Sequence, residues 1–377
     1  MKIAVAKERR AGETRVAAVP ETVKKFAKLG VSVTVETGAG LAADMPDSAF
    51  SDAGADIAPD LASAAAGADV VLKILRPTED EIGHLAAGQM LFCSMAPYAE
   101  PEIMQACAAR GVDAFAMELM PRITRAQSMD VLSSQSNLAG YKAVIEAANA
   151  YGRGMPQMMT AAGTIAPAKV FIMGAGVAGL QAIATARRLG AIVSATDVRP
   201  ATEEQVQSLG AKFVAVKNDE FKEAQTAGGY AKEMSDDYKR QQAELIADHI
   251  SKQDIVITTA LIPGRRAPIL VTADMVKSMK PGSILVDLAV EQGGNVEGAE
   301  LDQVVETENG AMIIGYGNMP GRLAADASSL YARNHLNFLT PFIKDGALAI
   351  DDEDELVKGI RLTKGGQIVH PNFAAKE

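Results

Sequence analysis

The feature that most constrains this chain is a short glycine motif between two predicted elements. Val170–Met173 is an apolar run long enough for one buried strand. Gly174, Gly176 and Gly179 follow with G-x-G-x-x-G spacing, and a helical pattern of apolar residues begins there. A second apolar run then reaches Asp197. This order of strand, glycine turn, helix and strand predicts a parallel βαβ unit.

Each part of this motif has a physical role in dinucleotide binding. The first glycine allows a tight turn, the second lets the backbone approach a pyrophosphate, and the third lets the helix pack closely on the strand. The helix N-terminus offers free N–H groups and a partial positive charge to the phosphates. The motif therefore predicts a dinucleotide site. The alternative is a tight turn in which the glycines serve packing alone.

The end of the second strand predicts which dinucleotide is bound. Asp197 lies 18 residues after Gly179, where a carboxylate can accept hydrogen bonds from the adenosine ribose. This favours NAD over NADP, because a 2′-phosphate would meet a negative charge, although an arginine such as Arg199 can accept that phosphate. We expect the cofactor contacts of this region to come from Gly174, Gly176, Val177, Ala178, Gly179, Asp197, Val198 and Arg199.

Composition and charge exclude several classes of function. The 377 residues are enough for two domains with separate cores. A formal net charge of −10 argues against nucleic acid as a partner. Cys93 and Cys107 lie in apolar patterns and the four histidines are scattered, so no metal site is predicted. The N-terminus begins with a strand pattern, and no apolar stretch is long enough for direct insertion into a membrane.

Strand and helix patterns alternate along the chain, which predicts an α/β fold. We expect two doubly wound parallel-sheet, Rossmann-like domains with a cleft between them. A helical stretch at residues 322–339 is predicted to return to the first domain. The first domain then comprises residues 1–133 and 322–377, and the NAD(H)-binding domain comprises residues 134–321. Strands of the first domain are expected at residues 2–6, 31–36, 69–75, 90–95 and 113–118.

Residues 119–140 break this alternation with a dense run of polar side chains. A connecting loop is polar for solubility alone, so an ordinary linker explains the composition equally well. The run also contains glutamine, aspartate and serine, which are the side chains that fix a nicotinamide carboxamide and ribose by hydrogen bonds. A segment that joins two domains lies naturally at a cleft. We expect the helix that enters the second domain to begin near Tyr141.

Two later segments complete the predicted nucleotide site. The connection before the strand at residues 254–259 is long and contains Gly229 and Tyr230, which is typical of a lid that closes over a nucleotide. A solvated surface loop is the alternative. That strand leads into a loop at the carboxyl end of the sheet, where we expect cofactor contacts from Thr259, Ala260 and Leu261.

Several segments together resemble a known family. They include AKERRAGETRVAAVPETV, MELMPRITRAQSMDVLSSQSNLAGY, TAGGYAKEM and TTALIPGRRAPILVT. The chain resembles the NAD(H)-binding component of proton-translocating transhydrogenases, in a superfamily that includes alanine dehydrogenase. The resemblance implies hydride transfer from NADH to NADP⁺ held by an NADP(H)-binding partner component, and a membrane-spanning component that carries protons. It also implies a homodimer in the cytoplasm, peripheral to the inner membrane through partner subunits.

The resemblance also assigns roles to individual residues. Arg122, Asp130 and Ser133 would grip the nicotinamide carboxamide. Gln127 would lie on the side of the nicotinamide ribose and face the incoming NADP(H) component. Tyr230 would lead the mobile loop that closes on the nucleotide.

An amino-acid dehydrogenase of the alanine type is the main alternative. That chemistry moves a proton as well as a hydride, so it requires a general acid or base. Arg15 and Lys73 match the substrate-binding residues that the resemblance implies for such enzymes, but Ala96 stands at the position of the histidine and Glu291 at that of the aspartate. Hydride transfer between two nicotinamides moves no proton, so the lack of an imidazole favours the transhydrogenase. A non-catalytic NAD-sensing module is a third possibility.

Overall fold

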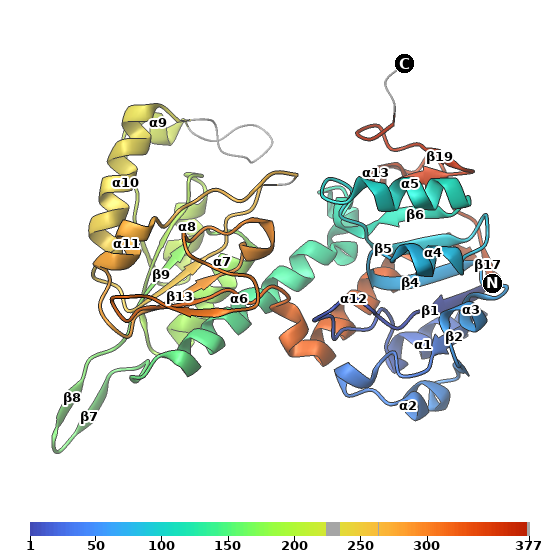
Figure 1. The fold of residues 1–377 in the computed structure, drawn as a ribbon, viewed down its shortest axis with the longest axis horizontal. Coiled ribbons are helices and arrows are strands. Elements are labelled where there is room, and N and C mark those ends of the chain that lie inside the picture. Colours follow the sequence, from blue (N-terminus) through green and yellow to red (C-terminus); the bar gives the residue numbers. More distant parts are fainter. Residues whose placement is uncertain (224–233, 263, 375–377) are drawn as a thin grey trace. The chain divides into compact units, whose positions relative to one another are not determined.

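The chain divides into two compact units. The computed structural model describes residues 1–223, 234–262 and 264–374. Unit 1 comprises Met1–Gln135 and Pro320–Glu377, and unit 2 comprises Ser136–Met319. These limits differ by two residues at each boundary from the domain limits that we expect from the sequence. Both units are α/β, which confirms the predicted fold class (Figure 1).

Unit 1 is built on a six-stranded parallel sheet. The strand order is β3-β2-β1-β4-β5-β6, so the first strand lies in the middle and the chain order reverses between β1 and β4. The predicted strands are all present, and β3 is an additional edge strand. The strands are β1 (Lys2–Val5), β2 (Ser32–Glu36), β3 (Asp56–Ala58), β4 (Val70–Leu75), β5 (Met90–Ser94) and β6 (Asp113–Ala116).

Helices cover both faces of this sheet. They are α1 (Pro20–Lys28), α2 (Asp47–Asp52), α3 (Leu61–Ala65), α4 (Glu79–Gly83), α5 (Pro101–Arg110), α12 (Ala324–Leu339) and α13 (Glu355–Ile360). Because side chains alternate along a strand, Ile3 and Val5 pack in one core with α1, α2 and α12, while Ala4 and Ala6 pack in another with α3, α4 and α5. α12 belongs to the same compact unit as the first 135 residues (Figure 1).

Unit 2 has the same kind of architecture. Its sheet has the order β11-β10-β9-β12-β13-β15-β14, with the reversal between β9 and β12 and one antiparallel edge strand, β14. The strands are β9 (Lys169–Met173), β10 (Ile192–Thr196), β11 (Lys212–Phe213), β12 (Ile255–Thr258), β13 (Ile284–Asp287), β14 (Val304–Glu306) and β15 (Met312–Ile314). The helices are α6 (Val131–Ala150), α7 (Val177–Arg188), α8 (Thr202–Ser208), α9 (Asp219–Lys222), α10 (Asp236–Ile250) and α11 (Ala273–Ser278).

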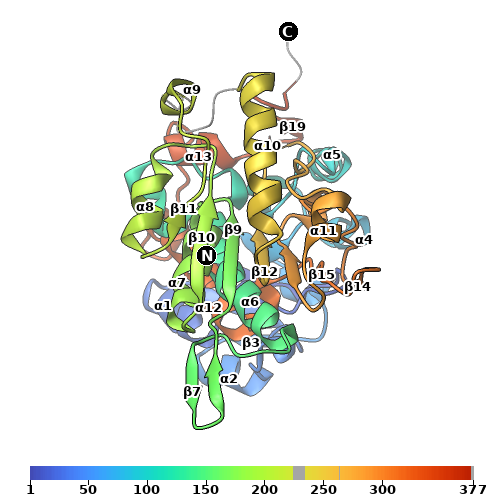
Figure 2. The ribbon, with the colours of Figure 1, turned by 90° about the vertical axis from the view of Figure 1, so that its left-hand side faces the viewer.

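The two faces of this second sheet also have separate cores. Val170 and Ile172 of β9 pack with α6, α7 and α8, whereas Phe171 and Met173 pack with α10 and α11. Figure 2 shows α10 running along the face formed by β9 and β12. Helix α6 approaches the start of α7 so closely that a Cβ on Gly140 would lie 2.0 Å from the carbonyl oxygen of Ala178. Only glycine allows this approach.

Several short elements complete the fold. The tail hairpin predicted from Gly365–Gly366 is present as β18 and β19, while the fully exposed hairpin of β7 and β8 was not predicted. The hairpins are β7 (Met158–Thr160) with β8 (Gly163–Ile165), β16 (Ile343–Lys344) with β17 (Ala347–Leu348), and β18 (Thr363–Lys364) with β19 (Gln367–Ile368). The 3₁₀ segments are η1 (Leu41–Ala43), η2 (Met117–Leu119), η3 (Thr124–Met129), η4 (Val290–Gln292), η5 (Pro320–Leu323) and η6 (Thr340–Phe342).

The helix into unit 2 begins earlier than the sequence pattern indicates. The pattern predicts a start near Tyr141, but α6 begins at Val131, so half of the polar run at residues 119–140 is helical. The cause is local, because the carboxylate of Asp130 accepts the backbone N–H of Ser133 and caps the first turn. Among the helices of the described residues, none has the length and apolar character needed to cross a membrane.

Candidate active site

The glycine turn of unit 2 is shaped by packing at two of its three glycines. Gly174 has a φ of 107°, and a Cβ there would lie 2.4 Å from Oγ1 of Thr259. A Cβ on Gly179 would lie 1.8 Å from the carbonyl oxygen of Gly174. The first glycine therefore permits the turn and the third permits the close approach of α7 to β9, as the motif predicts.

Gly176 differs from its two neighbours. Its φ of −78° suits any residue, and a Cβ there would meet no described atom within 4 Å. Gly176 is the N-cap of α7, and within the described part of the chain no side chain caps this helix end. The first N–H groups of α7 therefore face open space with the positive end of the helix dipole, which suits a pyrophosphate. Packing within the described residues gives no reason for glycine at position 176, and the space beside it leaves room for the pyrophosphate that the motif predicts.

Asp197 follows β10 at the same edge of the sheet. One carboxylate oxygen accepts the N–H of Ala175 at 2.7 Å, which fixes the glycine turn. The guanidinium of Arg199 donates to both carboxylate oxygens at 3.0 Å, and its hydrogen bonds to Asp197 raise the pKa of Arg199. The residue between them, Val198, is half exposed. Asp197, which suits a ribose hydroxyl, and Arg199, which suits a 2′-phosphate, are thus paired with each other.

The loop after β12 is held by residues that the glycine motif does not reveal. Thr259 donates its hydroxyl to the carbonyl oxygen of Gly174 at 3.2 Å, so this loop closes against the glycine turn. Asn295, fully buried, accepts the N–H of Ala260 at 3.0 Å and donates to its carbonyl oxygen at 2.9 Å. The carboxylate of Asp287 in turn accepts the N–H of Asn295 at 2.7 Å.

The candidate cofactor residues therefore gather at one edge of unit 2. They follow β9, β10 and β12, which are adjacent strands, and the carboxyl ends of parallel strands meet at one edge of a sheet. Val177 and Leu261 are apolar yet 42% and 49% exposed, so this edge offers apolar contact surface as well as free N–H groups. Gly229 and Tyr230, the predicted lid residues, lie outside the described residues.

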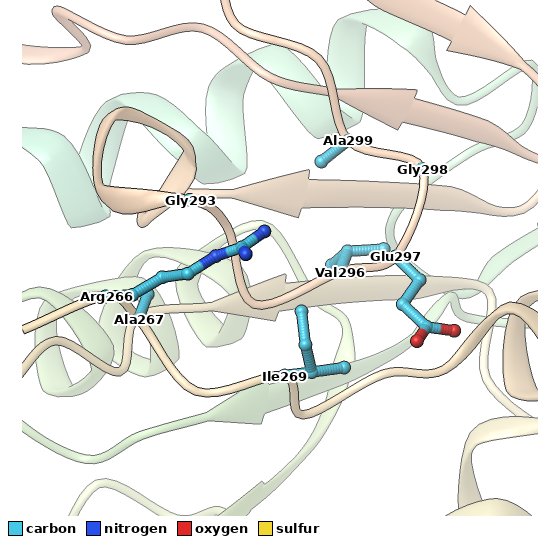
Figure 3. A pocket seen from close by; sticks show the side chains of 8 residues that line it. All are labelled: Arg266, Ala267, Ile269, Gly293, Val296, Glu297, Gly298 and Ala299. Carbon is cyan, nitrogen blue, oxygen red and sulfur yellow. The ribbon is translucent and has the colours of Figure 1, made fainter.

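Unit 2 also has a pocket of about 470 Å³, which lies between residues 266–269 and 293–299. The Arg266 side chain lies across Gly293, whose φ is 94° and whose Cβ would lie 2.6 Å from the arginine Nε (Figure 3). None of the residues predicted to bind the cofactor lines this pocket. The lining residues are Arg266, Ala267, Ile269, Gly293, Val296, Glu297, Gly298 and Ala299.

The polar segment of unit 1 contains the residues predicted to contact the nicotinamide. Asp130 and Ser133 are brought together, since the serine hydroxyl donates to Oδ2 of Asp130 at 2.5 Å and the serine N–H donates to Oδ1 at 3.0 Å. Gln127 lies in η3 and is exposed, and its side chain forms no hydrogen bond with a described residue. Arg122 precedes η3 and is also exposed. The structure therefore presents Gln127 and Arg122 to solvent and ties Asp130 to Ser133.

Charged side chains are buried within β4 and in the segment that follows β1 in unit 1. Arg15 binds both carboxylate oxygens of Glu13, at 2.8 and 2.6 Å, and donates to Gln135 at 2.8 Å. Lys73 donates to Glu81 at 2.7 Å and lies 3.4 Å from Glu8. Both cations are thus paired with carboxylates of the chain itself, which satisfies the requirement that buried charges be compensated.

Ala96 follows β5 in a backbone conformation that is rare for residues other than glycine, with a φ of 49°. The carboxylate of Glu118 accepts the N–H groups of Met95 and Ala96 at 2.8 and 2.6 Å and so holds this turn. Burial of its carboxyl group raises the pKa of Glu118 to about 7, and Oε2 has no hydrogen-bond partner among the described residues. The turn is therefore fixed by a buried carboxyl group, and the side chain that it presents is a methyl group.

The fold and its glycine turn define the class of Rossmann-like α/β proteins. The family model for the C-terminal domain of alanine dehydrogenase/PNT matches residues 143–371, and that for the N-terminal domain matches residues 4–139. The chain belongs to the alanine dehydrogenase/PNT family.

Individual relatives agree with this assignment. The chain is 54% identical to a chain of NAD(P) transhydrogenase subunit alpha from Rhodospirillum rubrum, over 98% of each chain. The crystal structure of a transhydrogenase from Sinorhizobium meliloti superimposes with a TM-score of 0.89 at 56% identity, over 98% of this chain and 100% of that one. Alanine dehydrogenase of Bacillus subtilis is more distant, at 30% identity over 97% of this chain and 92% of that one.

Proposed function

We propose that this chain is the NAD(H)-binding component of a proton-translocating transhydrogenase. The relatives that match it over nearly their whole length at more than half identity carry the transhydrogenase name. The open N-terminus of α7, Gly176 and the loop held by Asn295 suit a bound dinucleotide. In this role the chain holds NADH, and an NADP(H)-binding component holds the acceptor.

The reaction needs alignment of two rings and no proton transfer at the hydride step. When NADH is bound, C4 of its ring supplies a hydride to C4 of NADP⁺, giving NAD⁺ and NADPH. The chain's contribution is to hold the donor ring in place and keep it accessible. We assign the carboxamide to Arg122, Asp130 and Ser133, where the tie between Asp130 and Ser133 gives a fixed pair of hydrogen-bonding groups.

The observation that carries this proposal over an amino-acid dehydrogenase is the turn after β5. A dehydrogenase of that kind needs a general acid or base near the reacting carbon. Ala96 occupies the expected position with a methyl group. His335 does not replace the missing imidazole, because it is completely buried and burial lowers its pKa to about 4. An imidazole with so low a pKa is a weak base at neutral pH.

We also propose a homodimer that lies in the cytoplasm and reaches the inner membrane through a membrane-spanning partner. The hairpin of β7 and β8 supports the dimer. Its side chains are all exposed, and Met158, Met159 and Ile165 are 40%, 80% and 39% exposed. Isolated two-stranded hairpins with exposed apolar side chains are only marginally stable in water, so a second copy of the chain is the occupant that we propose for this surface.

One binding measurement and two reactions on the same preparation test the proposed function. NADH binding is followed by fluorescence, then NADH oxidation is measured with pyruvate and ammonium, and then NADPH formation is measured after addition of an NADP(H)-binding transhydrogenase component with NADP⁺. We expect binding, no oxidation with pyruvate, and NADPH formation only with the added component. Oxidation with pyruvate would instead identify an amino-acid dehydrogenase. Binding without either reaction would identify an NAD-sensing module.

A further inference from the structure

The segment that carries Gln127 is held by few bonds of its own. It is a 3₁₀ helix, whose hydrogen bonds have poorer geometry than those of an α-helix. Ala126 and Met129 are buried in the core of unit 1, whereas Gln127 and Ser128 are exposed. Ala126 and Met129 therefore fix the position of the segment. The orientation of the backbone between them depends on other contacts.

Those contacts come from α12, which lies about 200 residues later in the chain. The Nδ2 groups of Asn334 and Asn337 both donate to the carbonyl oxygen of Ser128, each at 2.9 Å. The two asparagines are three residues apart and so project from the same face of the helix. A carbonyl oxygen has two lone pairs, and here both are used. The bonded carbonyl belongs to the residue directly after Gln127.

Asn334 also holds the other end of the segment. Its Oδ1 accepts the hydroxyl of Ser134 at 2.8 Å, and its side chain is only 5% exposed. One buried amide therefore ties Ser128 to Ser134, and the residues between them include Asp130 and Ser133. Arg125 is a further tie, since its guanidinium donates to both carboxylate oxygens of Asp354 at 2.8 and 2.6 Å. This pair is half exposed on the arginine side and lies before Gln127, so it does not replace the clamp at Ser128.

We propose that Asn334 and Asn337 are positioning residues that fix the Gln127 side chain for hydride transfer. This inference rests on the proposed function, because it assumes that Gln127 lies beside the reacting nicotinamide. The asparagines touch neither ring. They act by fixing the Ser128 carbonyl. Because Ser128 directly follows Gln127, this restricts the backbone at Gln127 and so the direction of the Gln127 side chain. A misplacement of about 1 Å at a reacting centre can reduce a rate about a hundredfold.

Asn337→Ala is the principal test, because Asn337 is partly exposed and its loss leaves the buried amide of Asn334 in place. We expect single-turnover hydride transfer to an added NADP(H)-binding component to fall about tenfold or more. We expect the Kd for NADH to change less than about twofold, because the role is alignment rather than binding. Arg333→Ala is the matched control, since Arg333 lies on the same helix and pairs with Glu21 away from η3. Asn334→Asp is the second variant, nearly isosteric but unable to donate to Ser128.

Hydrogen–deuterium exchange of a peptide that spans residues 124–134 separates the two proposals. We expect faster exchange in Asn337→Ala than in the wild-type chain and in Arg333→Ala. Unchanged exchange would overturn the clamp whether or not the wild-type chain transfers hydride. Faster exchange with an unchanged transfer rate would overturn the positioning role. A wild-type chain without transfer would refute the proposed function and, with it, the role in hydride transfer, while the exchange data would still decide whether the clamp exists.

Discussion

The guanidinium of Arg199 forms two hydrogen bonds of 3.0 Å with the carboxylate of Asp197, and both residues follow β10 at the edge of unit 2. The carboxylate is nearly buried, while the guanidinium is about a third exposed. We expect this pairing to favour NAD(H) over NADP(H) at the predicted dinucleotide site. As long as Asp197 is present, it binds the Arg199 guanidinium, which could otherwise bind a 2′-phosphate.

Asp197→Asn should therefore change selectivity between the two dinucleotides. The asparagine removes the charge that repels a 2′-phosphate and releases Arg199 to bind it. We expect NADH affinity to fall about tenfold, because a hydrogen bond to a charged group contributes about 1.5–3 kcal/mol, and NADPH affinity to rise. Fluorescence titration with both dinucleotides measures this. The double variant Asp197→Asn with Arg199→Ala should lose the gain for NADPH, and an equal NADPH affinity in both variants would exclude Arg199 as the phosphate ligand.

The glycines of the turn should separate binding from stability. Gly176→Ala should leave the melting temperature unchanged, because a Cβ there meets no described atom, and should weaken NADH binding about tenfold or more by blocking approach of the pyrophosphate. Gly179→Ala should lower the free energy of unfolding by about 1–3 kcal/mol, because its Cβ would overlap the Gly174 carbonyl. Thermal melts and NADH titrations distinguish the two. Unchanged NADH affinity in Gly176→Ala would show that the pyrophosphate lies elsewhere.

Gln127→Asn should slow hydride transfer with little effect on NADH affinity. The side chain is exposed and bonds to no described residue, so shortening it by one methylene should not affect stability. We expect a fall of about tenfold to a hundredfold in single-turnover transfer, since the proposed role is alignment. Ser128→Ala, which keeps the clamped carbonyl, is the matched control. A normal transfer rate in Gln127→Asn would remove Gln127 from the reaction.

Glu118 should make the stability of the chain fall as pH rises. Burial raises its pKa from 4.5 to about 7, so the folded state keeps a proton that the unfolded state loses. The contribution of Glu118 to the free energy of unfolding is full below about pH 4.5 and is lost as the pH rises to about 7. The loss amounts to about 3 kcal/mol. Glu118→Gln should abolish that loss. Denaturant unfolding at pH 5 and pH 8 checks this, and an equal pH dependence in both chains would contradict it. His335, whose pKa is lowered, also makes stability depend on pH. Both chains contain it, so its contribution cancels in the comparison.

A charge on the hairpin of β7 and β8 should separate the proposed dimer. Met159 is 80% exposed, so Met159→Lys costs the folded chain little and would place a charge in an apolar interface. We expect sedimentation velocity to give a dimer for the wild-type chain and a monomer for Met159→Lys at micromolar concentration. Thr164→Ser, a change that keeps a polar residue on the same hairpin, is the control. A dimer that survives Met159→Lys would place the interface on another surface.

Strands with a buried face or a clear turn signal could be predicted from the sequence, and short strands without either could not. β1, β4 and β5 are apolar runs in a parallel sheet that is covered on both sides, so their pattern is strong. β3 has three residues with one buried side chain, and the hairpin of β7 and β8 has none. A strand that buries nothing has no alternation to detect. The sequence does contain a signal for the early start of α6. Asp130 lies three residues before Ser133, which is the spacing at which an N-cap side chain accepts a backbone N–H.

The same distinction applies to the candidate site. The glycine turn is local and could be predicted together with the packing roles of Gly174 and Gly179. The clamps that hold the neighbouring loops are long-range, since Asn295 and Ala260 are 35 residues apart and Asn334 and Ser128 are 206 apart. Asparagine is common in loops and on helices, so its residue type alone does not indicate such a bond. Only the register of the folded strands and helices brings these pairs together.

The return of α12 to unit 1 has a consequence for the order of events during synthesis. Unit 2 is one continuous stretch, so it can fold as soon as residues 136–319 have left the ribosome. Unit 1 must wait for α12, whose Ser328 accepts the N–H of Val16 and whose Tyr331 is part of the central core. Its first 135 residues therefore remain exposed to chaperones and proteases while the whole of unit 2 is translated. A stalled ribosome before α12 would leave a folded unit 2 attached to an incomplete unit 1.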